Sequence, residues 1–132
     1  MNDAIEQRTE RVERIENASP LWRGITVWHA AFGGIFAWMA HLVFLASFMH
    51  YTHLHPGYGW TLHAATGFCA LVTISSILLA WRLHRIASGA DAAGYDDAGQ
   101  MLFFAQFGLL LGIINLALIL VEGSYVLFIP RG

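Results

Sequence analysis

Four histidines lie within fifteen residues of the chain, in the segment MHYTHLHPGYGWTLH that runs from Met49 to His63. Imidazole nitrogen binds copper and zinc well, so His50, His53, His55 and His63 are candidate metal ligands. No cysteine accompanies them, and their spacing matches no fixed ligand motif. A polar turn at a membrane surface is the alternative, and we prefer it because the run HPGYG contains the proline and glycines of a tight turn.

Other polar side chains lie within or at the ends of long apolar stretches, where they normally face protein because hydrocarbon does not solvate them. We interpret four of them as polar contacts between helices: His41, His63, Asn115 and Glu122. A second interpretation makes His41 and His63 the axial ligands of a haem b. Their expected depths in the membrane differ by about two helical turns, which counts against it. A third gives Glu122 a role in proton relay or quinone contact.

A row of small and polar residues occupies the third apolar stretch. Gly108, Gly112, Asn115, Ile119 and Glu122 follow one another at spacings of three and four, so they share one face of a helix. Gly108 and Gly112 form a GxxxG pair, which permits close approach of a second backbone. This helix-packing face is predicted to contact either the chain's own helices or a larger membrane complex.

Motifs of catalysis are not found in the sequence. It contains no Ser/His/Asp set, no paired carboxylates, no glycine-rich phosphate loop and no CxxC motif. Its single cysteine, Cys69, allows no disulfide within the chain and is interpreted as a packing residue. We therefore do not expect an enzyme.

Three long apolar stretches must position the candidate residues. Hydrophobic residues make up 57% of the chain and charged residues 12%, against about 25% charged in soluble domains. Residues 25–50, 60–82 and 101–128 are each long enough to cross a bilayer, which takes about 20 residues. A backbone in lipid must satisfy its own hydrogen bonds, so each should be an α-helix. The sequence predicts an all-α membrane protein with one transmembrane domain, residues 20–132.

Arginine sets the expected orientation. Six of the seven arginines lie before the first span or just after the second, so both segments should be cytoplasmic and the C-terminus periplasmic. Residues 1–19 carry mixed charge and are predicted to form a cytoplasmic helical arm. The net charge of −2, without a basic cluster, gives no reason to expect nucleic acid as a partner.

The three spans resemble a known family. They read FGGIFAWMAHLVFLASF at 32–48, WTLHAATGFCALVTISSILLAWR at 60–82 and MLFFAQFGLLLGIINLALILVEG at 101–123. These segments resemble the spans of small uncharacterised three-span bacterial membrane proteins found beside cytochrome c oxidase genes, with His41 and His63 at matching positions. The chain lacks the cysteines often seen in that family's first loop and C-terminus, and it adds His50, His53 and His55.

The resemblance implies an accessory or assembly role near an aerobic oxidase in the bacterial inner membrane. We therefore expect a non-catalytic accessory subunit of a membrane respiratory complex, surrounded by lipids and docked through the 108–122 face and the N-terminal arm. The alternative is a cofactor-binding module, with haem b on His41 and His63 or periplasmic copper on the loop histidines. A small anchor similar to those of succinate dehydrogenase is a third possibility. The residues alone assign no cofactor, and the preferred interpretation uses none.

Overall fold

Three long helices form the part of the chain that the structure describes. The computed structural model describes residues 6–7, 20–91, 94 and 98–128. Its elements are α2 (Pro20–Leu54), the short 3₁₀ helix η1 (Pro56–Tyr58), α3 (Trp60–Asp91) and α4 (Ala98–Phe128). These described residues contain no strand, and α2, α3 and α4 are each long and apolar enough to cross a membrane. The predicted all-α membrane fold is confirmed, whereas the predicted arm at 1–19 lies outside the described residues except at 6–7.

The helices extend beyond the predicted spans, and the longest extension at a single end is that of α3. This helix ends at Asp91, so the start of the segment expected to be cytoplasmic is helical. The reason is local, because the run from Arg82 to Ser88 contains no glycine or proline. Ala87 in this extension is fully buried, and the Ser88 hydroxyl donates to the His84 carbonyl at 2.7 Å. The helix therefore continues nine residues beyond the predicted span at 60–82.

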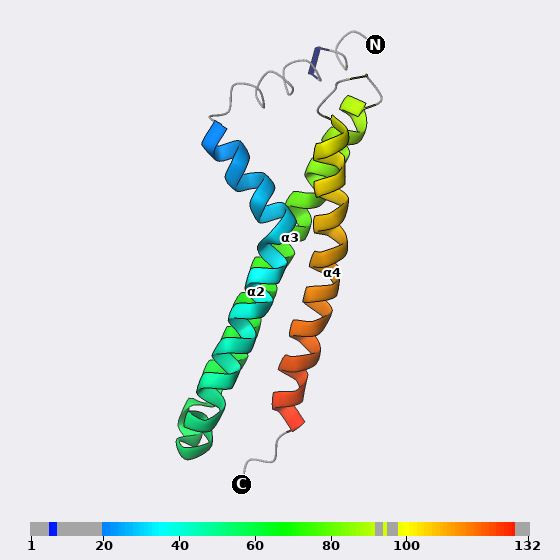
Figure 1. Cartoon of the computed structure of the whole chain (residues 1–132). Coiled ribbons are helices and arrows are strands. Elements are labelled where there is room, and N and C mark those ends of the chain that lie inside the picture. The colour runs from blue at the N-terminus through cyan, green and yellow to red at the C-terminus, as the bar shows by residue number, and fades with distance from the viewer. Residues whose placement is uncertain (1–5, 8–19, 92–93, 95–97, 129–132) are drawn as a thin grey trace.

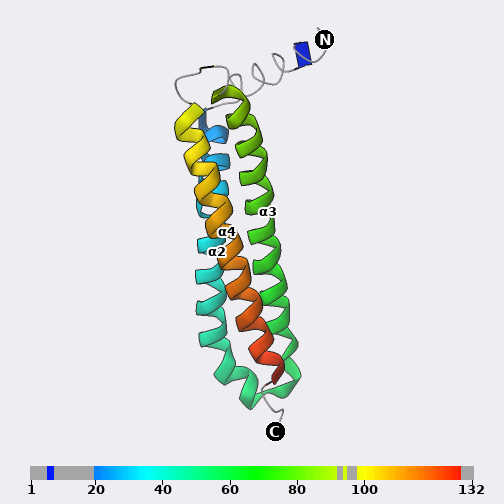
Figure 2. The same ribbon diagram turned by 90° about the vertical axis from the view of Figure 1, so that its right-hand side faces the viewer.

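The interior of the bundle is made largely of small side chains. Figure 2 shows the three helices side by side along most of their length, and each packs against the other two. Lipid tails are as apolar as leucine, so helices associate in a membrane through close packing rather than hydrophobic burial. The buried positions of α4 recur at spacings of three, four or seven: Ala98, Ala105, Gly108, Gly112, Asn115, Ile119 and Gly123.

Glycines set the distance between α2 and α4. A Cβ atom added at Gly108 would collide with the carbonyl group of Ala30 on α2. One turn further along, a Cβ atom at Gly34 would lie 3.2 Å from the Cα atom of Gly112. Because these positions carry no side chain, the two backbones cross in direct contact.

The N-terminal part of α2 does not follow the bundle. Figure 1 shows it bending away from α3 and α4 above the point where the helices cross. Paired small residues such as Gly33 and Gly34 are a common cause of helix bending. The Ser76 hydroxyl on α3 donates to the His29 carbonyl at 2.7 Å and ties α2 to α3 beside this bend.

Substitutions at two glycines, one at the crossing and one with open space beside it, test the direct contact of the backbones. Gly108→Ala should lower the thermal unfolding midpoint in detergent, because the new methyl group meets the Ala30 carbonyl. Gly67→Ala on α3 is the matched control, since a Cβ atom there meets nothing within 4 Å. It should leave the midpoint unchanged or raise it slightly, because alanine favours helix over glycine by up to about 1 kcal/mol. Equal midpoints for the two variants, measured by circular dichroism, would contradict the direct backbone crossing.

Candidate functional site

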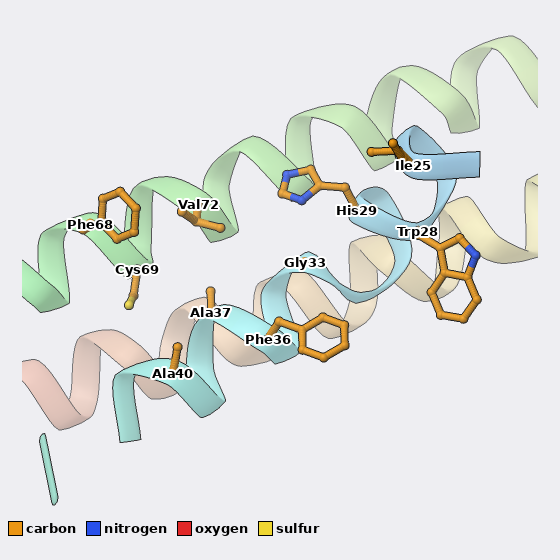
Figure 3. A pocket seen from close by; sticks show the side chains of 10 residues that line it. All are labelled: Ile25, Trp28, His29, Gly33, Phe36, Ala37, Ala40, Phe68, Cys69 and Val72. Atoms are coloured by element: carbon orange, nitrogen blue, oxygen red, sulfur yellow. The ribbon is translucent and has the colours of Figure 1, made fainter. Parts of the chain in front are cut away.

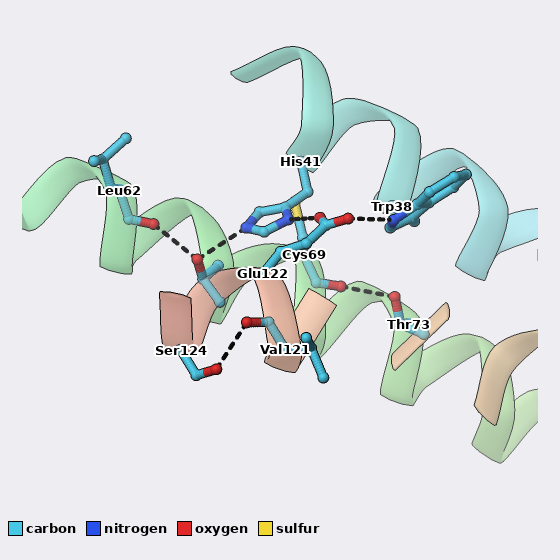
Figure 4. A network of polar contacts seen from close by, with 9 residues as sticks. Trp38, His41, Leu62, Cys69, Thr73, Val121, Glu122 and Ser124 are labelled. Atoms are coloured by element: carbon cyan, nitrogen blue, oxygen red, sulfur yellow. Dashed lines mark hydrogen bonds and ion pairs between the residues drawn. The ribbon is translucent and has the colours of Figure 1, made fainter. Parts of the chain in front are cut away.

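Four side chains from the three helices form a connected polar cluster inside the bundle (Figure 4). The indole N–H of Trp38 donates to Oε1 of Glu122 at 3.1 Å. The other carboxyl oxygen, Oε2, lies 3.2 Å from Nδ1 of His41. The second imidazole nitrogen of His41, Nε2, lies 2.9 Å from the hydroxyl oxygen of Thr66. We call these residues, Trp38, His41, Thr66 and Glu122, the polar cluster.

Helical spacing and one glycine bring the polar cluster together. Trp38 and His41 are three residues apart on α2, so both point to one side of that helix. Glu122 comes from α4 and Thr66 from α3. A Cβ atom at Gly123 would lie 3.1 Å from the Thr66 hydroxyl oxygen and 3.3 Å from Thr66 Cβ. Glycine at 123 therefore allows α3 and α4 to approach closely enough to surround His41.

His41 is the most deeply buried member of the polar cluster. The His41 side chain has no exposed surface, while that of Glu122 is 26% exposed. Ile119, one turn before Glu122, is also fully buried and packs with Ala37 and Cys69. The buried imidazole needs hydrogen-bond partners from the protein, because water cannot reach it to replace a missing one. The Glu122 carboxyl group supplies one of these partners.

The number of donor hydrogens in the polar cluster restricts the direction of each hydrogen bond. The Thr66 hydroxyl has one hydrogen and donates it to the Leu62 carbonyl at 2.9 Å, so its oxygen accepts from the Nε2–H of His41. Nδ1 and Oε2 then need one further proton between them, since two lone pairs would repel. If the Thr66 hydroxyl instead points toward Nε2, the imidazole carries its hydrogen on Nδ1 and donates it to Glu122. The direction of the Thr66 hydroxyl therefore selects which nitrogen of His41 carries the hydrogen.

Two of the residues predicted as interhelical contacts lie elsewhere. The Asn115 amide donates to the Leu111 carbonyl of its own helix at 2.7 Å. His63 is half-buried on the first turn of α3 and is not part of the polar cluster. Thr66, about 4.5 Å further along the helix axis, occupies the level of His41 instead.

The haem interpretation is not supported by this geometry. An axial ligand presents a free imidazole nitrogen to the iron, but both nitrogens of His41 already face Thr66 and Glu122. The predicted partner ligand, His63, lies one turn away from the level of His41. The sequence predicts a depth difference of about two helical turns, whereas the structure separates the two positions by about one turn. The hydroxyl group of Thr66, and not His63, lies at the level of His41.

The loop histidines do not assemble into a metal site. His50 and His53 are exposed on the last turns of α2, which continues to Leu54. His55 stacks on Tyr51, with ring centroids 4.5 Å apart, and its Nδ1 donates to the Tyr51 carbonyl at 3.2 Å. Across residues 20–91, 94 and 98–128, no three His, Cys, Asp or Glu side chains lie together as a metal would require. The four-histidine copper set is therefore not formed.

The predicted helix-packing face lies inside the bundle. Gly108, Gly112, Asn115 and Ile119 are all buried against α2 and α3. Another subunit cannot reach these residues while the bundle is intact. The expectation that this face docks onto a larger complex is therefore wrong, because the chain's own helices already cover it.

Trp38 and Thr66 belong to the site but were not predicted from the sequence. The sequence does place both residues one helical turn from a candidate histidine, since Trp38 lies three residues before His41 and Thr66 three residues after His63. Neither residue was distinguished from the rest of its apolar stretch. Helical spacing from the buried histidine could have identified Trp38, whereas the level of Thr66 depends on how α3 packs.

Comparison with protein-family models, with curated proteins and with solved structures finds no match to this chain.

The polar cluster predicts unequal costs for two histidine substitutions. His41→Ala should lower the free energy of unfolding by about 2 kcal/mol, because Glu122 loses its partner in a poorly solvated position. His63→Ala, at a half-buried position outside the cluster, should change it by less than about 0.5 kcal/mol. Denaturant titration in mixed micelles measures both values, and a similar cost at the two positions would contradict the importance of the cluster.

A second prediction concerns the proton on His41. Thr66→Val removes the acceptor of Nε2–H, so the imidazole should carry its hydrogen on Nδ1 and donate it to Glu122. Thr66→Ser retains the hydroxyl group and should retain the protonated Nε2 of the unmodified protein. Nitrogen-15 NMR of histidine-labelled protein distinguishes the two ring nitrogens. An unchanged His41 spectrum in Thr66→Val would refute the assigned hydrogen-bond directions.

Proposed function

We propose that this protein is a non-catalytic accessory subunit of a membrane respiratory electron-transfer complex, associated with a cytochrome c oxidase. The observation that supports this most is the internally satisfied interior of the bundle. Within the described ranges, every buried side-chain nitrogen or oxygen atom has a hydrogen-bond partner. The three helices therefore form a self-contained body whose contribution to a larger assembly is its shape and its outer surface.

The resemblance of the three spans to small membrane proteins encoded beside cytochrome c oxidase genes supports the choice of complex. The same resemblance supports a bacterial inner membrane as the location. The arginine distribution supports a cytoplasmic N-terminus and a periplasmic C-terminus. The polar cluster then holds the three helices in register rather than carrying out chemistry on a substrate.

The outward side of α4 is our proposed docking surface. Phe103 is 62% exposed and stacks on Phe107, with ring centroids 6.1 Å apart, and Phe104 lies beside it at 5.8 Å. Leu110 continues this side one turn further and is 62% exposed. Large aromatic side chains held in place by one another are well suited to contact another protein. The N-terminal arm is proposed as a second contact.

The accessory role predicts which proteins leave the membrane together with this one. Extraction of the tagged chain from native membranes in mild detergent should recover oxidase subunits in stoichiometric amount, as measured by native electrophoresis and mass spectrometry. Recovery of the chain alone, or only with further copies of itself, would refute the proposal.

Two tryptophan substitutions test whether the partner subunits contact the outward side of α4. Leu110→Trp adds bulk to the outward side of α4 and should reduce recovery of the partner subunits at least severalfold. Val43→Trp places the same bulk on α2, where the side chain is 66% exposed, and should not reduce it. Both variants should keep the helical content of the unmodified chain, which circular dichroism verifies. Loss of partners in Val43→Trp alone would move the docking surface from α4 to α2.

A further inference from the structure

An open groove of about 550 Å³ lies between α2 and α3, on the side of α2 that faces away from α4 (Figure 3). Its floor is formed by small residues, among them Gly33, Ala37 and Cys69. Three large aromatic side chains flank it, Trp28, Phe36 and Phe68, and each is more than 60% exposed. Small floor residues between large flanking residues give a channel deep enough to hold a narrow apolar molecule.

One end of the groove is polar. His29 lines it near the N-terminal end of α2, and its Nε2 lies 3.1 Å from the Ser75 hydroxyl oxygen. Ser75 donates its own hydrogen to the Val72 carbonyl at 2.7 Å, so Nε2–H of His29 is the donor to Ser75. The neutral imidazole then has a free lone pair on Nδ1. Figure 3 shows this side of the ring facing Gly33, and a Cβ atom added at Gly33 would lie 2.8 Å from Nδ1.

The length of the groove can be compared with the thickness of a membrane. It extends from Ile25 to Ala40 along α2, which is roughly 22 Å of helix axis. The hydrocarbon core is about 30 Å thick, so a groove that begins at Ile25, the predicted start of the first span, would reach past the centre. His29 lies toward the surface end, and apolar residues line the remainder. A molecule with a polar end and an apolar body could place its polar end beside His29 and its apolar body along the remaining lining residues.

The lining residues also restrict the polar end of such a molecule. None of them is charged, so no cation is supplied there for a phosphate group. Nδ1 of His29 accepts a hydrogen bond in the tautomer described above and donates one in the other tautomer. A hydroxyl group can serve as partner in both cases, whereas an ether or a carbonyl oxygen can only accept.

We propose that this groove binds an uncharged lipid that carries a hydroxyl group at its polar end. The hydroxyl group donates to Nδ1 of His29, and the apolar body lies over Gly33 and Ala37 toward Ala40. This lipid site does not depend on the accessory role proposed above. A helix of a second copy of the chain would instead fill the groove with apolar side chains and leave Nδ1 without a partner.

Photolabelling tests this assignment on the whole chain in phosphatidylcholine vesicles. The probes are a hexadecanol that carries a diazirine in mid-chain and its methyl ether, which lacks the donor hydrogen. Peptide mapping should find the alcohol on residues 33–40 and 68–72 in roughly fivefold excess over the ether, as expected for one neutral hydrogen bond. Competition by unlabelled diacylglycerol or by a quinol then shows which of these neutral lipids supplies the hydroxyl group.

Two variants and a control separate the site from general lipid contact. His29→Phe retains a ring of similar size and should reduce labelling by the alcohol to the level of the ether. Gly33→Leu fills the floor and should reduce labelling by both probes. Phe103→Leu, on the outward side of α4, should leave groove labelling unchanged. Folding is verified by circular dichroism, and His29→Phe decides the test if Gly33→Leu does not fold.

The proposal fails if the alcohol and the ether label the groove equally, because an acyl chain alone would then account for the occupancy. It also fails if the diazirine is excluded from the groove while residues 33–40 cross-link to a second copy of the chain. In that case the groove is a surface for self-association.

Discussion

The carboxyl group of Glu122 is the constraint on which the arrangement of the bundle depends. It lies on a helix that is otherwise almost entirely apolar, and lipid offers no hydrogen bonds to it. Trp38 and His41 of α2 each hydrogen-bond to one of its two oxygens. Sliding or rotation of α2 against α4 would therefore leave a carboxyl oxygen unpaired. Thr66 engages the remaining nitrogen of His41 and extends the same constraint to α3. Four side chains thus set the register of all three helices.

A second contact, at the opposite end of the α2–α4 interface, determines how the helices cross. Gly108 touches the backbone of α2 at Ala30, and fourteen residues separate it from Glu122, or about 21 Å of helix. Two contacts so far apart fix both the spacing and the angle of α2 against α4. The groove between α2 and α3 lies beside this crossing and includes Gly33 in its floor.

Much of the fold follows from the sequence, because length and apolar composition alone require three membrane helices. The alignment of Gly108, Gly112, Asn115 and Ile119 on one face also follows from helical spacing, and these residues do lie together. What covers that face could not be predicted, since glycine permits contact with any backbone and does not specify which. The site was predicted in part: His41 and Glu122 stood out as polar residues in apolar spans. Thr66 was missed because its level relative to His41 depends on the packing of α3, which no local pattern encodes.

Two histidines of the same helix show why residue type alone does not identify a ligand site. His41 is fully buried, and both of its nitrogens are engaged by side chains of the other helices, so it holds the bundle in register. His29 is only partly buried, and one nitrogen is occupied by Ser75 while the other faces an open groove. Burial raises the cost of leaving a nitrogen unpaired, so a fully enclosed histidine in a stable bundle must already have its partners. A histidine at the edge of the bundle is free of this requirement, and for that reason the capacity to bind another molecule lies with His29.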